Sequence, residues 1–301
     1  MAVQAPARGS AAGLGIAAAC FIGWGLMPFY FKALVHVDPV EVVAHRIVWS
    51  ALFLACLLPF GGRMEELRRL PSSPRPLLTL AFTACLISVN WVIYVVAVQT
   101  GNVLDTSLGY FLGPLVSVAL GVAVLKERLS RVQAAAVALA ALAVVNLIWQ
   151  LGVVPKVALV LGISFSIYGL LRKRLPVSPA LGLLVECLVV LPMALAAFVW
   201  VARTKGLTFL HGDAGTDILL VAGVVITAGP LLLFNVGAKR LNYATIGVMQ
   251  YIAASMLFLE SVLIFGEPLA FWRLVTFLLI WTALAMYSAD ALIRARETRH
   301  G

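Results

Sequence analysis

A histidine and an arginine stand side by side within one of the most apolar stretches of the sequence, EVVAHRIVWSALFLAC. His45 lies four residues after Glu41, so these side chains share a helix face, whereas Arg46 projects about 100° away. Ionisable groups in apolar helices turn inward and find partners. Glu186 occupies the counterpart helix in the second half of the chain, and we expect it to contact His45 and Arg46. Such contacts would form either a gate or substrate charge site, or a structural ion pair that locks two helices.

Amide, hydroxyl and aromatic side chains recur in the other apolar segments. Asn90 and Tyr94 are four residues apart and share a helix face. A cavity lined by aromatic rings and amides suits an amphipathic organic solute better than a bare ion. A single ring is better explained by core packing or by the membrane interface, whereas the rings and amides taken together favour a binding cavity. The further candidates for substrate binding or gating are Trp24, Tyr30, Asn90, Trp91, Tyr94, Tyr110, Ser164, Tyr168, Asn235, Gln250 and Tyr251.

Small residues recur at every fourth position of the segment 104–125, namely Gly109, Gly113, Ser117 and Gly121. Such a ladder lets another helix backbone approach closely, so we expect these residues to serve helix packing. The expected neighbour is the segment 244–265. Glu127 and Glu267 come directly after these two segments, and we expect each to cap or anchor the turn to the next helix.

The sequence lacks the spacings that metal sites and common catalytic centres need. Its histidines are His36, His45, His211 and His300, and no two of them are spaced as metal ligands. The four cysteines fall inside apolar segments and form no CxxC pair, which is typical of small core side chains. Neither HExxH nor a Walker motif occurs. We therefore expect no catalytic centre, no metal and no cofactor.

The elements that position these residues are apolar helices long enough to cross a membrane. Of the 301 residues, 62% are hydrophobic and 12% charged, whereas soluble domains have about 45–50% apolar and about 25% charged residues. A bilayer-spanning helix needs about 20 mostly apolar residues. Such segments are predicted at 13–35, 39–60, 77–98, 104–125, 132–151, 154–171, 180–202, 216–238, 244–265 and 271–292. The sequence therefore predicts an all-α polytopic membrane protein with ten transmembrane helices, surrounded by the lipid bilayer.

Positive charges gather on alternate connections between these segments. If the N-terminus lies in the cytoplasm, the cytoplasmic segments hold 16 of the 22 lysines and arginines. By the positive-inside rule, both termini are then cytoplasmic. The net charge of +9 anchors loops to anionic lipid, and no basic platform with interleaved aromatic residues suggests nucleic acid. The oligomeric state stays open.

Near residue 152 the sequence pattern starts again. The stretch SLGYFLGPLVSVALGVAVLKERL in the first half is answered by TIGVMQYIAASMLFLESVLIFGEPL in the second, with Gly109 matching Gly247. Because five crossings is an odd number, the second copy enters from the opposite side, which gives the inverted repeat of many secondary transporters. The expected organisation is a cytoplasmic tail at 1–12, a first five-helix repeat at 13–151, a second at 152–293 and a cytoplasmic tail at 294–301.

Several stretches carry a resemblance to a known family: EVVAHRIVWS (41–50), NW (90–91), SLGYFLGPL (107–115), SFSIYGLLRK (164–173), LLVECLVVLP (183–192), GPLLLF (229–234), QYI (250–252) and IWTALAMYSADAL (280–292). Over nearly its whole length the chain resembles the RarD type of EamA transporter, in the drug/metabolite transporter superfamily. The resemblance implies a ten-helix inverted-repeat bundle in a bacterial inner membrane. The first four helices of each half would surround a central cavity, and the type is linked to chloramphenicol sensitivity. The chain departs from the type at Ala253–Ala254, where Gly-Pro is expected, and at Glu260, where an apolar residue is expected.

Two functions compete. The first is a secondary transporter, an exporter of small organic metabolites or drugs, working by alternating access around a central cavity. ATP would not drive it without a Walker motif, and proton coupling would use Glu186 or His45. The second is a membrane-embedded enzyme acting on lipid or polyprenyl substrates, which needs a clustered catalytic constellation. The absence of such a cluster favours transport.

Overall fold

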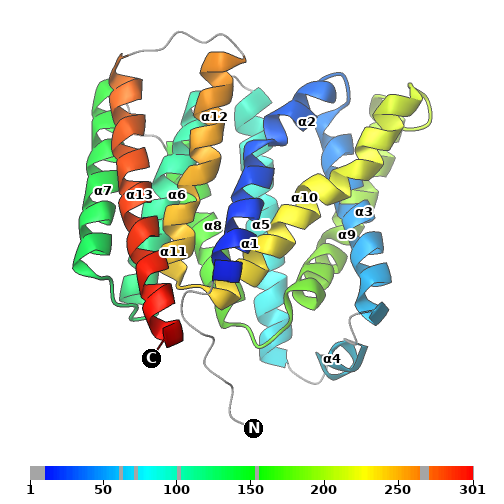
Figure 1. Ribbon diagram of the computed structural model, residues 1–301. Coiled ribbons are helices and arrows are strands. Elements are labelled where there is room, and N and C mark those ends of the chain that lie inside the picture. Colours follow the sequence, from blue (N-terminus) through cyan, green and yellow to red (C-terminus); the bar gives the residue numbers. More distant parts are fainter. Residues whose placement is uncertain are drawn as a thin grey trace.

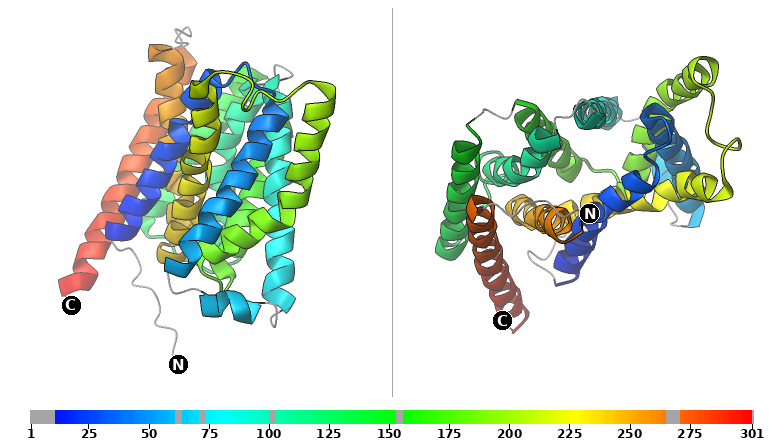
Figure 2. Two further views of the ribbon diagram at one scale, coloured as in Figure 1. Left: turned by 90° about the vertical axis from the view of Figure 1, so that its right-hand side faces the viewer. Right: turned by 90° about the horizontal axis from the view of Figure 1, so that it is seen from above.

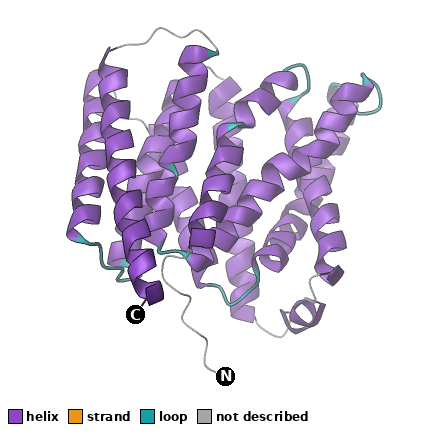
Figure 3. Ribbon diagram, in the orientation of Figure 1, coloured by secondary structure: helices purple, strands orange, loops and turns teal. Residues whose placement is uncertain are grey.

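The chain folds as a bundle of helices. The computed structural model describes residues 11–60, 64–70, 74–99, 103–152, 156–264 and 271–300. Within these ranges the helices are joined by turns and short loops, and none of the described residues forms a strand (Figure 3). Seven helical segments there are long and apolar enough to cross a membrane, and a shorter apolar helix covers Tyr110–Ala123. The predicted all-α membrane class is therefore confirmed.

The helices run side by side along one axis, and the start of α1 and the end of α13 lie toward the same end of the bundle (Figures 1 and 2). Each of the ten segments expected from the sequence falls on one long helix or on two consecutive helices. The helices are α1 (Ala11–Gly25), α2 (Met27–Ala33), α3 (Pro39–Phe60), α4 (Met64–Arg69), α5 (Pro74–Gln99), α6 (Val103–Ala123), α7 (Arg131–Leu151), α8 (Lys156–Arg174), α9 (Pro179–Thr204), α10 (Ala214–Arg240), α11 (Tyr243–Met249), α12 (Tyr251–Leu263) and α13 (Phe271–His300).

Two of the expected segments are broken helices. The first segment divides at Leu26 into α1 and α2, and Pro28 stands in the first turn of α2, where its missing N–H costs nothing. The segment expected as one helix at 244–265 divides at Gln250 into α11 and α12. There the N–H of Gln250 donates to the carbonyl of Gly247 at 3.1 Å, a tighter turn than the α-helical one.

Helices from the two halves of the chain pack on each other. The helix α3 packs along α9, α1 along α10, and α6 along both α8 and α11, while α7 and α13 stand together at one edge (Figures 1 and 2). Glycine permits the closest of these contacts. A Cβ added at Gly162 of α8 would lie 3.0 Å from the backbone nitrogen of Gly113 in α6. A Cβ at Gly121 would lie 2.9 Å from the nitrogen of Ala244, so the ladder on α6 faces both α8 and α11.

Glu127 caps a helix that is distant in sequence. Its carboxylate accepts hydrogen bonds from the backbone N–H groups of Tyr243 at 2.6 Å and Ala244 at 2.8 Å, at the start of α11. The sequence predicts that Glu127 caps or anchors the turn to the next helix. The structure has it capping α11 instead, and the next helix, α7, is capped by Ser130 in a capping box with Gln133. Glu267 lies outside the described residues.

Large apolar side chains point outward from the bundle. Leu142, Val145 and Trp149 of α7 and Met193 of α9 are each at least 60% exposed. Water would solvate such a surface poorly, whereas lipid acyl chains contact it at no cost. This surface agrees with the membrane assignment.

Candidate functional site

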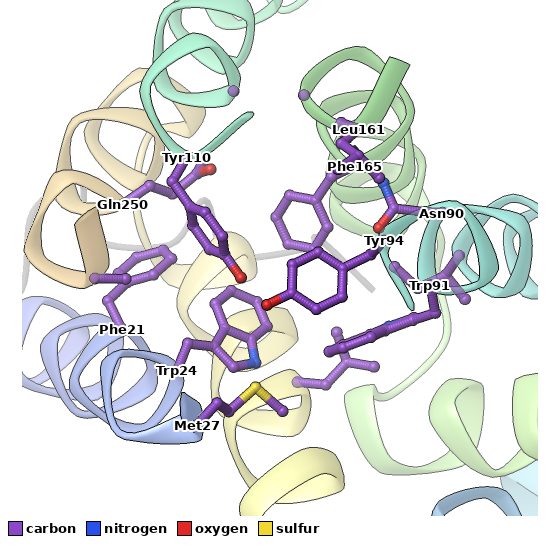
Figure 4. A pocket seen from close by; sticks show the side chains of 15 residues that line it. Phe21, Trp24, Met27, Asn90, Trp91, Tyr94, Tyr110, Leu161, Phe165 and Gln250 are labelled. Carbon is purple, nitrogen blue, oxygen red and sulfur yellow. Dashed lines mark hydrogen bonds between the residues drawn. The ribbon is translucent and has the colours of Figure 1, made fainter. Parts of the chain in front are cut away.

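A cavity lies between the helices of both halves, walled by α1, α2, α5, α6, α8, α10 and α12 (Figure 4). Its volume is ≈ 100 Å³, which is below the range of about 300–1,000 Å³ for pockets that take drug-sized ligands. In this conformation it has room for a small solute or part of a larger one. The candidate residues that line it are Trp24, Asn90, Trp91, Tyr94, Tyr110 and Gln250, together with Gly113.

Aromatic rings form much of the cavity wall. The ring of Trp24 lies 5.4 Å from that of Phe165 between centroids, and the ring of Trp91 lies 5.9 Å from that of Tyr94. Figure 4 shows the hydroxyl groups of Tyr94 and Tyr110 directed toward each other. Large rigid rings of this kind offer apolar area with little loss of conformational entropy on binding.

The two amides of the cavity are held in place from behind. Asn90 donates to the hydroxyl of Ser164 at 2.8 Å and to the carbonyl of Leu161 at 3.0 Å. Gln250, at the break between α11 and α12, donates to the hydroxyl of Ser117 at 3.1 Å. Each amide is therefore held by a hydrogen bond to a neighbouring helix. Ser164 accepts a hydrogen bond from Asn90 but does not itself line the cavity.

Glu186 does not contact His45 or Arg46, so the expected cluster of these three residues is wrong. The Glu186 carboxylate accepts from Thr83 Oγ1 at 2.6 Å and from the Tyr168 hydroxyl at 3.2 Å. Its counter-ion is Arg172, whose Nε lies 3.4 Å from Glu186 Oε1. Arg172 stands near the end of α8, and its side chain is only 1% exposed.

Asn235 completes this group of side chains, which we call the buried polar network: Thr83, Tyr168, Arg172, Glu186 and Asn235. Its amide donates to the Tyr168 hydroxyl at 3.1 Å, and its Oδ1 accepts from Arg172 Nε at 3.2 Å. None of the five lines the cavity. The ring of Phe165, which does line it, lies 6.0 Å from the ring of Tyr168.

His45 lies in an aromatic setting near one end of α3. Its Nδ1 accepts from Trp49 Nε1 at 3.0 Å, and its ring lies 4.6 Å from the Phe209 ring. Its Nε2 is 3.8 Å from Glu41 Oε1, which places both on one helix face. Glu41 was not among the candidate residues for binding or gating. Its fully buried carboxylate accepts hydrogen bonds from the N–H groups of Thr208 and Phe209. This contact fastens the connection between α9 and α10.

The remaining candidates lie at the margin of the cavity or away from it. Arg46 stacks on Trp91, with its guanidinium carbon 4.0 Å from the ring centroid. Tyr30 is buried, and its hydroxyl finds no hydrogen-bond partner among the described residues. Tyr251 points away from the cavity, since its hydroxyl donates to the Phe111 carbonyl at 3.2 Å. Glu260 is buried in α12, and its Oε2 has no partner.

Sequence reasoning missed the apolar part of the cavity wall. The residues concerned are Phe21, Met27, Ile87, Leu161, Gly162, Phe165, Leu231 and Ala253. Their types are those of any packed membrane helix, so no sequence signal separates them from the rest of the core. Among the described residues, no group of three or more His, Cys, Asp or Glu side chains could hold a metal ion.

Several known proteins similar to this chain are transporters by name. The EamA-like transporter family model matches residues 11–149. An uncharacterized transporter of Pseudomonas aeruginosa is 44% identical, covering 90% of this chain and 91% of that protein. Protein RarD of Escherichia coli is 36% identical, covering 95% and 97%, and the chloramphenicol-sensitive protein RarD of Pseudomonas aeruginosa is 32% identical, covering 91% and 93%.

A solved crystal structure of a protein superposes on the chain with a TM-score of 0.72 at 16% identity, covering 93% of this chain and 98% of the other. At that identity the likeness shows the fold alone. Fold, outward apolar surface and relatives together define a multi-pass membrane protein of the transporter class. The chain belongs to the EamA-like transporter family, and its identity of 36–37% to RarD proteins places it in the RarD type.

Proposed function

We propose that the protein is a secondary transporter that exports small organic solutes across the bacterial inner membrane by alternating access around the central cavity. The cavity carries this proposal, because aromatic rings and two anchored amides from both halves of the chain converge on it. Such a lining suits an amphipathic solute. One relative is named a chloramphenicol-sensitive protein, and chloramphenicol is an organic compound of this kind.

The pairing of helices supports an inverted repeat of five plus five helices, at 13–151 and 152–293. If the halves correspond in order, α3 pairs with α9, α6 with α11 and α7 with α13, and each pair is packed together. Contacts between helices that do not correspond also occur in matching pairs. The contact of α1 with α12 has its counterpart in that of α8 with α6, and the contact of α5 with α9 has its counterpart in that of α10 with α3. A pseudo-two-fold axis would produce this pattern, with the cavity near it.

The break at Gln250 offers a place where the bundle could bend. A helix interrupted at its middle can pivot there without losing a full set of backbone hydrogen bonds. Gln250 lines the cavity at this point. We infer that α11 and α12 move relative to each other as access changes from one side to the other. Both termini would stay in the cytoplasm, as the distribution of positive charges indicates.

Solute measurements in cells and vesicles test the proposal. Extracellular metabolites of cells lacking and overproducing the protein would be compared, and we expect the level of at least one organic solute to follow the amount of protein. Asn90→Ala should abolish that dependence, whereas Tyr251→Phe, which alters a hydroxyl outside the cavity, should retain it. Unchanged solutes together with altered lipid composition would instead support the membrane-embedded enzyme.

A further inference from the structure

Arg46 is a buried cation resting on aromatic rings. Its side chain is 8% exposed, and its guanidinium carbon lies 4.0 Å from the centroid of Trp91 and 5.6 Å from that of Phe31. Within the part of the chain that the structure describes, its Nε has no hydrogen-bond partner. Arginine keeps its charge in proteins, so this group cannot become neutral to escape burial.

None of the described carboxylates lies within ion-pair distance of Arg46. The buried carboxylates of α3 itself and of α9, which packs along it, are engaged elsewhere. Glu41 accepts from the backbone of the α9–α10 connection, and Glu186 is paired with Arg172. Stacking on a ring offsets only part of the cost of removing a cation from water, so the guanidinium retains a strong preference for an anion.

The guanidinium lies beside the central cavity. Trp91, on which it stacks, lines that cavity. Tyr30 lies beside the same side chain, because a Cβ added at Gly223 of α10 would meet both the Tyr30 hydroxyl and, at 3.7 Å, Arg46 Cγ. Among the described residues the Tyr30 hydroxyl has no hydrogen-bond partner, so it is a second unsatisfied buried polar group. Two unsatisfied donors thus stand together at the edge of an aromatic cavity.

We propose that Arg46 and Tyr30 bind the negatively charged group of the transported solute, a carboxylate, while its apolar or aromatic body occupies the cavity. This deepens the proposed transport function and rests on it. The planar guanidinium matches a carboxylate with two parallel hydrogen bonds, and the phenol of Tyr30 donates a third. The small cavity and its rings suit a compact organic acid rather than a polyanion.

Uptake by reconstituted protein tests the assignment. The full-length chain would be placed in vesicles of phosphatidylcholine alone, which excludes anionic lipid headgroups as ligands. The probe is a bacterial small-molecule extract, divided by anion exchange into retained and unretained fractions, with accumulated solutes identified by mass spectrometry. We expect accumulation from the retained fraction, with carboxylates among the solutes.

Variants at Arg46 separate recognition from folding. Arg46→Gln should lower uptake of the accumulated acid by about 30-fold or more, because a buried charge partner is lost. Arg46→Lys keeps the charge without the planar fork and should retain part of the uptake. Arg69→Gln, on the exposed helix α4, is the matched control and should leave uptake unchanged. If Arg46→Gln does not elute as a folded protein, Tyr30→Phe replaces it, with an expected loss of about tenfold.

The outcomes distinguish this inference from the transport proposal. Accumulation of neutral or cationic solutes alone would overturn carboxylate recognition and leave transport standing. Undiminished uptake of the acid by folded Arg46→Gln would do the same. Accumulation of no solute in either fraction would overturn both.

Discussion

The ion pair between Arg172 on α8 and Glu186 on α9 should stabilise the bundle only while both members are present. Their side chains are 1% and 3% exposed. Glu186→Leu removes the acceptor of Thr83 and Tyr168 and leaves the Arg172 charge uncompensated. Arg172→Met leaves the Glu186 carboxylate buried without its counter-ion. The double variant Arg172→Met/Glu186→Leu replaces both charges with apolar side chains of similar size.

Magnitudes predict a clear order among these variants. Breaking a buried pair by removing one member costs about 3–5 kcal/mol, whereas replacing the whole pair with apolar side chains is often neutral. Thr83, Tyr168 and Asn235 each lose a hydrogen-bond partner in the double variant, at about 1 kcal/mol apiece. We therefore expect the double variant to be more stable than the sum of the single changes by about 3 kcal/mol or more.

The assay is reversible unfolding in mixed micelles, followed by tryptophan fluorescence, with thermal unfolding as a second measure. The matched control is the pair Glu65–Arg69 on α4, whose side chains are 72% and 76% exposed. For such a surface pair the coupling free energy, the difference between the double variant and the sum of the single changes, is about 0–1 kcal/mol. Additive single effects at Arg172 and Glu186, or a coupling no larger than that of the control, would refute the reasoning.

Three further predictions concern a helix cap, a close backbone contact and an exposed ion pair. Glu127→Gln should cost about 1–2 kcal/mol, measured by the same unfolding assay, because the amide keeps only one acceptor for the two N–H groups at the start of α11; no change would mean that the cap is dispensable. Gly162→Val should separate α8 from Gly113 and lower the thermal stability more than Gly162→Ala, and equal stability would contradict the contact. Partial burial raises the pKa of the Asp38 carboxyl, but the hydrogen bond and charge of Lys205 outweigh it and hold that pKa below its ordinary value. This ionised carboxylate therefore contributes stability above about pH 4 that is lost as the pH falls through the lowered pKa. The stability difference between the parent and Asp38→Asn should shrink below about pH 4, and a difference that stays constant from pH 7 to pH 3 would contradict the assignment.

Much of the cavity lining could be anticipated from polar residues in apolar helices. Asn90, Trp91 and Tyr94 line the cavity because they lie within one and a half turns of α5. Apolar lining residues such as Leu161 could not be anticipated, since nothing in their type distinguishes a cavity wall from a lipid-facing or packed surface. The break at Gln250 was also missed, because no proline marks it and Gly247, three residues earlier, was interpreted only as the counterpart of Gly109.

The sequence by itself determined the class of the protein and the positions of its helices. A run of about 20 apolar residues can only be accommodated in a membrane as a helix, so the element follows from local composition. Sequence also indicated that His45, Arg46 and Glu186 are turned inward, since lipid cannot solvate them.

Only the tertiary structure decided which partners these groups have. Glu186 pairs with Arg172, Glu127 caps α11, and Arg46 faces the cavity edge without a described carboxylate. Partner choice depends on how far each helix is rotated about its own axis and where it crosses its neighbours. A rotation of one residue, about 100°, moves a side chain to another face, and hydropathy does not specify that angle.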